Sequence, residues 1–202
     1  MAERQAGGSG WSEHLHFFGR FLRRPRTVGA IAPSSRSLAR RMVAGLDLDR
    51  DARVVELGPG TGAFTHEIVT RLSPVARYLA VDIDSTFVER LQERWPHLDC
   101  VCASASALPA LASARDLAPV DHIISGLPFA SLPVETTRDI LDAIGAILRV
   151  GGTFTTFQYV HAFQLAPAVT FRRAMTARLG APPQTALVVW NLPPAWVHHV
   201  RM

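Results

Sequence analysis

Residues 54–62 have the sequence Val54-Val55-Glu56-Leu57-Gly58-Pro59-Gly60-Thr61-Gly62. The apolar, β-branched start is typical of a buried strand, and three glycines follow at every second position. Because glycine lacks a Cβ, a glycine-rich turn lets the backbone approach a ligand where a side chain would clash. The stretch therefore predicts a strand that leads into a ligand-binding turn, with a helix after it.

On the C-terminal side of this turn, predicted strands and helices alternate. We expect strands at 53–57, 78–83, 99–103, 120–125 and 153–159, and helices at 63–72, 85–95 and 132–149, the last ended by Gly151-Gly152. Alternation of this kind predicts a parallel sheet with helices on both faces. A helix at 169–179 and successive strands at 185–190 and 195–201 predict an antiparallel end to the sheet. The fold class is therefore α/β, with a mostly parallel seven-stranded sheet.

A second acid supports a nucleoside-binding site. Asp82 follows Gly62 by twenty residues and ends the second predicted strand, where a carboxylate can bind ribose hydroxyls. The glycine spacing is G-x-G-x-G, with Glu56 two residues before Gly58, and so differs from the G-x-G-x-x-G of nicotinamide-binding turns. We therefore expect a nucleoside cofactor of another kind.

The composition excludes several classes of protein. The chain has 202 residues, enough for one domain with a sizeable core. All 21 basic residues are arginine, which excludes Schiff-base lysine enzymes and P-loop kinases. Cys100 and Cys102 lie two residues apart on one predicted strand, so we expect free thiols in a reducing compartment, and no Cys/His set has zinc spacing. We expect no metal and no membrane-spanning helix.

The glycine turn resembles motif I of the class I S-adenosylmethionine-dependent methyltransferases, whose core is Rossmann-like. The resemblance implies S-adenosylmethionine as cofactor, with Glu56 near its methionine end and Asp82 on its ribose. The full set of cofactor-binding residues that it implies is Glu56, Gly58, Pro59, Gly60, Thr61, Gly62, Asp82, Ile83, Ser104 and Ala105. Ser104 stands where the family often has an aspartate beside the adenine.

Three further segments resemble the bacterial phospholipid N-methyltransferases. They are Phe21-Leu22 with Val28-Gly29-Ala30-Ile31-Ala32-Pro33-Ser34-Ser35, then Ser125-Gly126-Leu127-Pro128, and finally Asn191-Leu192-Pro193-Pro194-Ala195. The resemblance spans residues 15 to 200. It implies successive N-methylation of phosphatidylethanolamine and its mono- and dimethyl derivatives towards phosphatidylcholine.

The reaction needs groups that orient an amine and accept its proton. Our first candidate is Tyr159 at the end of the fifth predicted strand, then His161, with the carbonyls of Ser125 and Gly126 as acceptors. Aromatic faces at Phe129 and Tyr159 could stabilise the methylated cation. The expected substrate-binding residues are Ser34, Ser35, Arg36, Leu127, Pro128, Phe129 and His161. Of these, Ser34 and Ser35 are expected on the lipid phosphate, together with Arg36 or Arg40.

The N-terminal segment predicts a membrane contact. After a polar, flexible segment at 1–10, residues 11–24 form an expected amphipathic helix that precedes one methyltransferase domain at 25–202. Its expected membrane-binding residues are Trp11, Leu15, Phe17, Phe18, Arg20, Phe21, Leu22, Arg23 and Arg24. Packing of its aromatic face on the sheet or on a second subunit is the alternative. We expect a cytoplasmic protein bound peripherally to the inner face of an anionic phospholipid membrane.

The net charge of +4 is unevenly distributed. Residues 1–46 hold eight arginines and two acids, whereas residues 151–202 hold four arginines and no acid. Basic ends suit an anionic partner, either lipid or nucleic acid. We expect lipid and no nucleic acid. The alternatives are an RNA adenine N-methyltransferase, which shares the cofactor site, and a non-catalytic membrane- or partner-binding module, against which the intact glycines and Asp82 argue.

Overall fold

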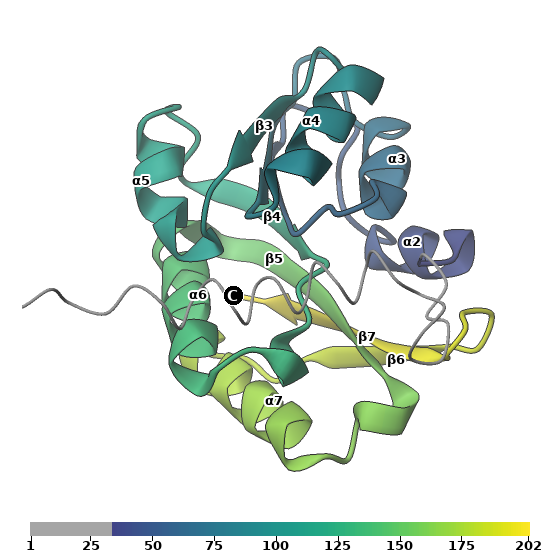
Figure 1. Cartoon of the computed structure of the whole chain (residues 1–202). Helices are drawn as coiled ribbons and strands as arrows, with labels where there is room; N and C mark the ends of the chain where they lie inside the picture. The colour runs from purple at the N-terminus through teal and green to yellow at the C-terminus, as the bar shows by residue number, and fades with distance from the viewer. Residues whose placement is uncertain (1–33) are drawn as a thin grey trace, which may run out of the picture. The chain divides into compact units, whose positions relative to one another are not determined.

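Seven strands form one mixed sheet in the computed structural model, which describes residues 34–202. The expected helix at 11–24 and the segment 1–10 lie outside the described residues. The strand order is β3-β2-β1-β4-β5-β7-β6 (Figure 1). The strands are β1 (Arg53–Leu57), β2 (Arg77–Asp82), β3 (Asp99–Cys102), β4 (Val120–Ser125), β5 (Leu148–Tyr159), β6 (Gln184–Val188) and β7 (Ala195–Arg201).

The first five strands run parallel to one another, and the last two form an antiparallel pair at one end of the sheet. In the centre, Val55 of β1 lies opposite Leu79 of β2 and Ile123 of β4. Strand β7 runs antiparallel to both β5 and β6, with Ala195 opposite Tyr159 on one side and Val188 on the other. The predicted Rossmann-like α/β architecture is confirmed.

Helices cover both faces of the sheet because the strands have apolar side chains on both faces. Val55 and Leu57 pack with residues of α5, α6 and α7, whereas Val54 packs with residues of α2, α3 and α4. Figure 1 shows these two sets of helices on opposite sides of the strands. The helices are α2 (Arg36–Met42), α3 (Ala63–Val69), α4 (Ser85–Arg94), α5 (Leu108–Ser113), α6 (Val134–Ile147) and α7 (Ala166–Leu179). None of these helices is long and apolar enough to span a bilayer.

The glycine pair expected to end the long helix lies inside a strand instead. Helix α6 ends at Ile147, and β5 begins at Leu148. Between the pairs Val120–Leu148 and His122–Thr153, β4 advances two residues and β5 advances five, so β5 is bulged there. Gly151 has φ +75°, and a Cβ on Gly152 would lie 2.8 Å from the Arg149 carbonyl oxygen. The bulge therefore requires the glycines.

Several short elements were not predicted. These are α5 and the 3₁₀ turns η1 (Ala105–Ala107), η2 (Phe129–Ser131) and η3 (Val160–Ala162). Elsewhere the element boundaries differ by a few residues: β6 ends at Val188 rather than at Trp190, and α7 begins at Ala166, with a proline in its first turn. Proline is tolerated there because its missing N–H would have no helical partner.

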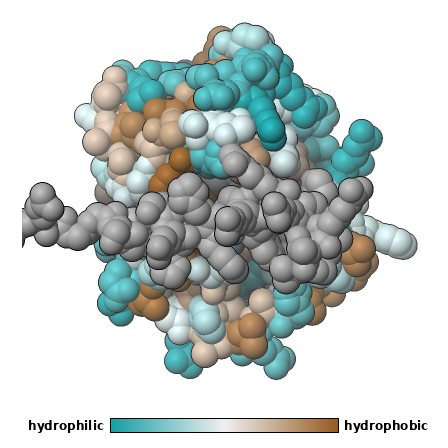
Figure 2. Space-filling model, viewed as in Figure 1, coloured by the Kyte–Doolittle hydropathy of each residue, from teal (hydrophilic) through white to brown (hydrophobic). Residues whose placement is uncertain are grey.

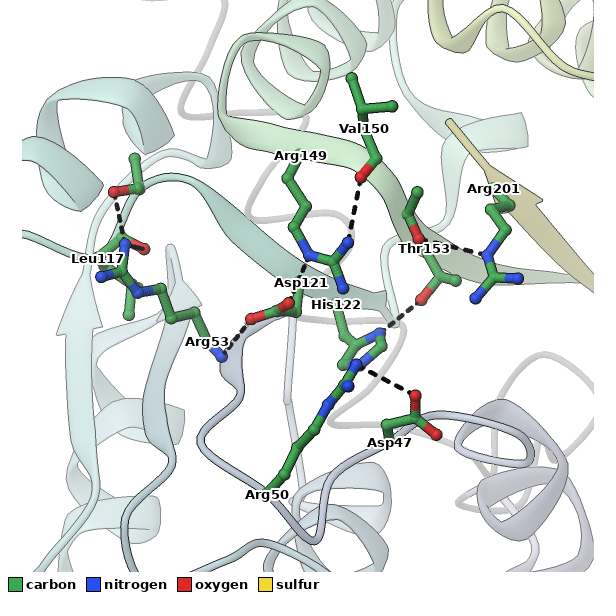
Figure 3. A network of polar contacts seen from close by, with 12 residues as sticks. Asp47, Arg50, Arg53, Leu117, Asp121, His122, Arg149, Val150, Thr153 and Arg201 are labelled. Atoms are coloured by element: carbon green, nitrogen blue, oxygen red, sulfur yellow. Dashed lines mark hydrogen bonds and ion pairs between the residues drawn. The ribbon is translucent and has the colours of Figure 1, made fainter.

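A polar network fixes the amino ends of β1, β4 and β5, far from the glycine turn (Figure 3). Asp121 accepts hydrogen bonds from the backbone N–H of Arg53 at 2.9 Å and from Nε of Arg149 at 2.5 Å. Burial alone would raise the pKa of Asp121, but these hydrogen bonds hold it below its ordinary value. Beside it, His122 Nδ1 lies 2.7 Å from Thr153 Oγ1. The network joins three strands and has a structural role.

Candidate functional site

The candidate site lies at the carboxyl ends of β1, β2 and β4. The chain leaves β1 towards β2 on one side and returns to β4 on the other, so the strand order reverses at β1. In open α/β sheets, ligands bind in the crevice at such a reversal. The sequence-predicted glycine turn and the loop after β4 both lie there.

The glycine turn has a backbone that only glycine adopts readily. Gly58, Gly60 and Gly62 have φ values of 65°, 53° and 79°. A Cβ on Gly58 would lie 2.6 Å from Leu127 Cδ2, and one on Gly62 would lie 2.9 Å from the Trp95 ring. All three glycines are therefore favoured by their conformation, and Gly58 and Gly62 also by their close neighbours.

The loop after β4 crosses directly over the glycine turn. The backbone N–H of Gly126 donates to the Leu57 carbonyl at 2.8 Å. A Cβ on Gly126 would lie 2.6 Å from the Gly58 carbonyl oxygen, which is backbone and cannot move freely. We call this segment, residues 125–129, the reaction-site loop because it holds the predicted acceptors Ser125 and Gly126. Gly126 is the position at which it contacts the predicted cofactor turn.

Asp82 connects the end of β2 to this turn. Its Oδ2 accepts from the Gly60 N–H at 3.0 Å, and its Oδ1 accepts from the Asp84 N–H at 3.0 Å. Burial raises the pKa of Asp82, although the backbone hydrogen bonds oppose the shift. A carboxylate at a strand end beside the turn has the chemistry required to bind ribose hydroxyls.

Glu56 is fully buried beneath the turn, where the Tyr78 hydroxyl donates to its Oε2 at 2.5 Å. Among the described residues, its other oxygen, Oε1, has no hydrogen-bond partner. Burial raises the pKa of Glu56 to about 7. An acceptor oxygen without a partner, next to a glycine turn that leaves room for backbone contacts, fits a cofactor that carries a hydrogen-bond donor or a positive charge.

The remaining expected cofactor residues lie around the ends of β2 and β3. Ile83 is exposed after β2, whereas Ala105 is buried at the start of η1. The Ser104 hydroxyl accepts from the Ser106 N–H at 3.3 Å and so caps η1. Pro59 and Thr61 lie within the turn itself.

The reaction-site loop places Phe129 differently from the expectation. Ser125 is fully buried, and its hydroxyl accepts from the Leu127 N–H at 3.3 Å. Phe129, after Pro128, is only 4% exposed and stacks on Phe171 of α7 with ring centroids 4.4 Å apart. The ring of Phe129 therefore packs into the core, and the expectation that it faces a methylated amine is wrong.

An aromatic row connects the reaction-site loop with the end of β5. Phe64, which lies beside Gly126, contacts Phe157 edge to face, and Phe157 contacts Tyr159 in the same way. Tyr159 then stacks on His161 with centroids 5.7 Å apart. Burial raises the pKa of Tyr159, so its hydroxyl stays protonated at neutral pH and can accept or donate hydrogen bonds. Sequence reasoning did not identify Phe64 or Phe157, whose role depends on this packing.

The expected phosphate-binding residues lie at the start of α2. The Ser35 hydroxyl accepts from the Leu38 N–H at 3.1 Å and so caps α2, which means that this oxygen is already engaged. Ser34 is half-buried and Arg36 is exposed. The Ser35 N–H donates to Asn191 Oδ1 at 2.8 Å, which connects α2 to the turn between β6 and β7. Asn191 is a residue for which sequence reasoning assigned no contact.

The described residues hold no cluster of histidine, cysteine or acidic side chains that could bind a metal ion. Cys100 and Cys102 are free thiols, the first buried and the second exposed. The expectation of unpaired cysteines is confirmed.

Comparisons with known proteins agree with this geometry. A family model described as a methyltransferase domain matches residues 54–152. Ornithine lipid N-methyltransferase from Singulisphaera acidiphila is 33% identical over 141 residues, which is 68% of this chain and 73% of that protein. Ribosomal RNA small subunit methyltransferase A from Parasynechococcus marenigrum is 32% identical over 107 residues, but the match covers only 32% of its length.

Solved structures share the fold at lower identity. The O-methyltransferase from Bacillus cereus in complex with SAH has a TM-score of 0.66 at 12% identity, covering 94% of this chain and 91% of that one. Precorrin-6y C5,15-methyltransferase from Geobacter metallireducens has a TM-score of 0.59 at 17% identity, covering 82% and 88%. The chain belongs to the class I S-adenosylmethionine-dependent methyltransferases, and S-adenosylmethionine is its cofactor.

The residues of the site fit this cofactor. Its ribose has hydroxyl donors for Asp82, and its methionine end carries an ammonium group, the kind of donor that the free oxygen of Glu56 lacks. Gly58, Gly60 and Gly62 lack a Cβ, which favours a close approach of this backbone to a ligand.

Proposed function

We propose that the protein transfers methyl groups to the amine of a membrane phospholipid, with phosphatidylethanolamine as substrate. The observation that carries the proposal is the similarity to ornithine lipid N-methyltransferase over most of both chains. The basic ends of the chain support a lipid surface as the place of reaction. The mono- and dimethylated lipids are substrates of the later steps, towards phosphatidylcholine.

When bound, S-adenosylmethionine would supply a methyl group on a sulfonium sulfur, which the lone pair of a neutral amine takes up as the carbon–sulfur bond breaks. Before that, a protonated lipid amine must lose a proton to water and be held in line. The buried surroundings of Ser125 disfavour a charged ammonium, which promotes loss of the proton. The carbonyls of Ser125 and Gly126 then accept the remaining N–H groups.

Tyr159 orients the amine from the end of β5. Because burial raises its pKa, the phenol acts through its neutral hydroxyl, as a hydrogen-bond acceptor rather than as a phenolate base. Its ring also replaces Phe129 as the aromatic face for the methylated cation, with His161 stacked behind it. Leu127 and Pro128 line the approach from the loop after β4.

We propose that residues 11–24 dock on the membrane, at its cytoplasmic face. This segment lies outside the described residues, and the proposal rests on its sequence. Four arginines at 20, 23, 24 and 26 each contribute about 1 kcal/mol near an anionic surface. Replacing Arg20, Arg23 and Arg24 by serine should therefore weaken binding of the full chain to anionic vesicles at physiological salt. Unchanged sedimentation would contradict this docking role.

The test of the proposed reaction uses methyl-labelled S-adenosylmethionine. The purified chain is offered phosphatidylethanolamine and an ornithine lipid, each in vesicles with phosphatidylglycerol, and unmodified ribosomal RNA in parallel. We expect label in mono-, di- and trimethylated phosphatidylethanolamine. Label confined to the ornithine lipid would keep lipid N-methylation and change the substrate. In a Tyr159→Phe variant, turnover should fall about tenfold or more while cofactor affinity is kept.

RNA adenine N-methylation is the second candidate. It is favoured by the similarity to ribosomal RNA small subunit methyltransferase A over 52% of this chain. Label in RNA alone, with binding that weakens steeply as salt is raised, would establish it in place of the lipid reaction.

A further inference from the structure

The turn between β6 and β7 exposes large apolar side chains. Trp190 is 82% exposed and Leu192 is 71% exposed, and Val189 beside them is also exposed. Tryptophan is enriched where proteins meet the interface of a lipid bilayer, because its ring is apolar and its N–H is polar. A group of large apolar side chains that faces only water does not stabilise the fold, so the cluster indicates a binding surface.

The turn is fixed in place rather than loosely attached. Asn191, between the two exposed residues, is only 5% exposed. Its Oδ1 accepts from the Ser35 N–H at 2.8 Å, and its Nδ2 donates to the Pro193 carbonyl at 2.7 Å. Because Asn191 points inward, Trp190 and Leu192 on either side of it point outward. Little ordering entropy is therefore lost when the turn binds a partner.

The same apolar surface continues onto the end of β5. The Val160 N–H donates to the Pro194 carbonyl at 2.9 Å, which joins η3 to the turn. Val160 and Leu165 are also exposed. Figure 1 shows the β6–β7 turn projecting beside α2, and Figure 2 shows hydrophobic surface on that side of the molecule. Tyr159, which directly precedes Val160, therefore lies next to this surface.

The charge around the turn favours an anionic partner. Helix α2, whose start is joined to the turn through Ser35 and Asn191, carries the exposed Arg40 and Arg41 and no acidic residue. Arg36, next to the Ser35 that binds Asn191, is exposed as well. An apolar tip beside the exposed arginines of α2 matches the interface of a bilayer that contains anionic lipids, whose surface attracts arginine and whose interior takes up apolar side chains.

We propose that the β6–β7 turn, residues 189–194, inserts into the interface of an anionic lipid bilayer and holds Tyr159 at the level of the lipid headgroups. This surface is distinct from the N-terminal segment at 11–24. The inference rests on the proposed lipid substrate, since it gives the amine of a lipid a short path from the bilayer to the end of β5.

The experiment compares three variants of the full chain. Trp190→Ser combined with Leu192→Ser removes the apolar tip. Val150→Ser is the matched control, because Val150 is 87% exposed but lies at the amino end of β5, at the opposite edge of the sheet. All the side chains are exposed, so both variants should melt within a few degrees of the wild type. Trp190→Phe, which keeps an apolar ring, should retain binding.

Sedimentation with vesicles of phosphatidylethanolamine and phosphatidylglycerol is the first measurement. The double substitution should weaken binding about tenfold or more, and Val150→Ser should leave it unchanged. Equal binding by the double variant and the control would overturn the proposal. So would a change in oligomeric state with vesicle binding kept, which would assign the turn to a contact between copies.

Methylation of a short-chain phosphatidylethanolamine, kept below its micelle-forming concentration, separates this inference from the proposed function. The double variant should methylate the soluble lipid as fast as the wild type and lose activity only on vesicles. Equal loss on both substrates would contradict a docking role. If the wild type methylates neither, the proposed reaction fails, while sedimentation still decides whether the turn binds the bilayer.

Discussion

Tyr78 and Glu56 form a buried pair directly beneath the cofactor turn, joined by a hydrogen bond of 2.5 Å from the phenol to the carboxylate. The two residues lie on the adjacent strands β2 and β1. Burial raises the pKa of Glu56 to about 7, and the hydrogen bond from Tyr78 only partly opposes this rise. Burial also raises the pKa of Tyr78. Near neutral pH, Glu56 therefore takes up or releases its proton within the cofactor site.

Replacing Glu56 by Gln should change how stability depends on pH. The folded pKa of about 7 lies above the ordinary value of 4.5, so the folded state holds an extra proton between these values. The stabilisation from this proton is fully present below pH 4.5 and is lost as the pH rises to 7, by on the order of 3 kcal/mol. Urea unfolding from pH 4.5 to 8 should show wild-type stability falling relative to Glu56→Gln. A constant difference would contradict the raised pKa.

His198 should produce the opposite dependence. Burial lowers its pKa from 6.5 to about 4, and Gln158 Oε1 lies 3.2 Å from its Nε2. The unfolded state therefore takes up a proton first, so the stabilisation from neutral His198 is present above pH 6.5 and is lost as the pH falls through 4. Relative to His198→Gln, the wild type should lose stability between pH 6.5 and 4, measured by urea unfolding. If the wild type instead gained stability relative to His198→Gln as the pH fell from 6.5 to 4, His198 would be charged in the folded protein.

Much of the fold could be predicted because its signals are local. Apolar strands, the glycine turn and the acid at Asp82 each lie within a few residues of the element that they define. Gly151-Gly152 misled the prediction because glycine after a helix usually ends it. Here the pair bulges β5 against β4, and that requirement comes from a neighbouring strand about thirty residues away in the sequence.

The site was predictable in its residues but not in its contacts. The prediction placed Gly58 and Gly126 in one site, but the contact between their loops is visible only in three dimensions. Phe129 was expected to face the substrate, yet it stacks on Phe171 of α7, an element whose packing the sequence does not reveal. Asn191 gains its role from Ser35, more than 150 residues earlier. These contacts depend on packing between residues far apart in the sequence, so they could not be predicted from the sequence.

Asp82 and Asp121 offer a matched comparison, because both carboxylates accept a hydrogen bond from a backbone N–H. Asp82→Asn should weaken S-adenosylmethionine binding about tenfold or more, since hydrogen bonds to charged groups are worth ~1.5–3 kcal/mol. Asp121→Asn loses its ion pair with Arg149 at the opposite edge of the sheet, so it should lower stability and leave cofactor affinity unchanged. Calorimetric titration measures both affinities. Equal weakening in the two variants would indicate a general loss of structure.

Gly126→Ala should disrupt the crossing of the two loops. The added Cβ would lie 2.6 Å from the Gly58 carbonyl oxygen, and because that atom is backbone, the glycine turn must shift. We expect a loss of about 1–3 kcal/mol in unfolding free energy together with weaker cofactor binding. Both are measured on the purified chain by urea unfolding and calorimetric titration.

Gly145→Ala is the control for this substitution. Gly145 lies inside α6, and a Cβ there would meet its nearest atoms at 3.8 Å, which is ordinary contact. Alanine favours the helix over glycine by up to ~1 kcal/mol, so this variant should be more stable and should bind the cofactor as the wild type does. If Gly126→Ala also bound S-adenosylmethionine normally, the loop after β4 would not constrain the cofactor turn, and its contact with Gly58 would serve stability alone.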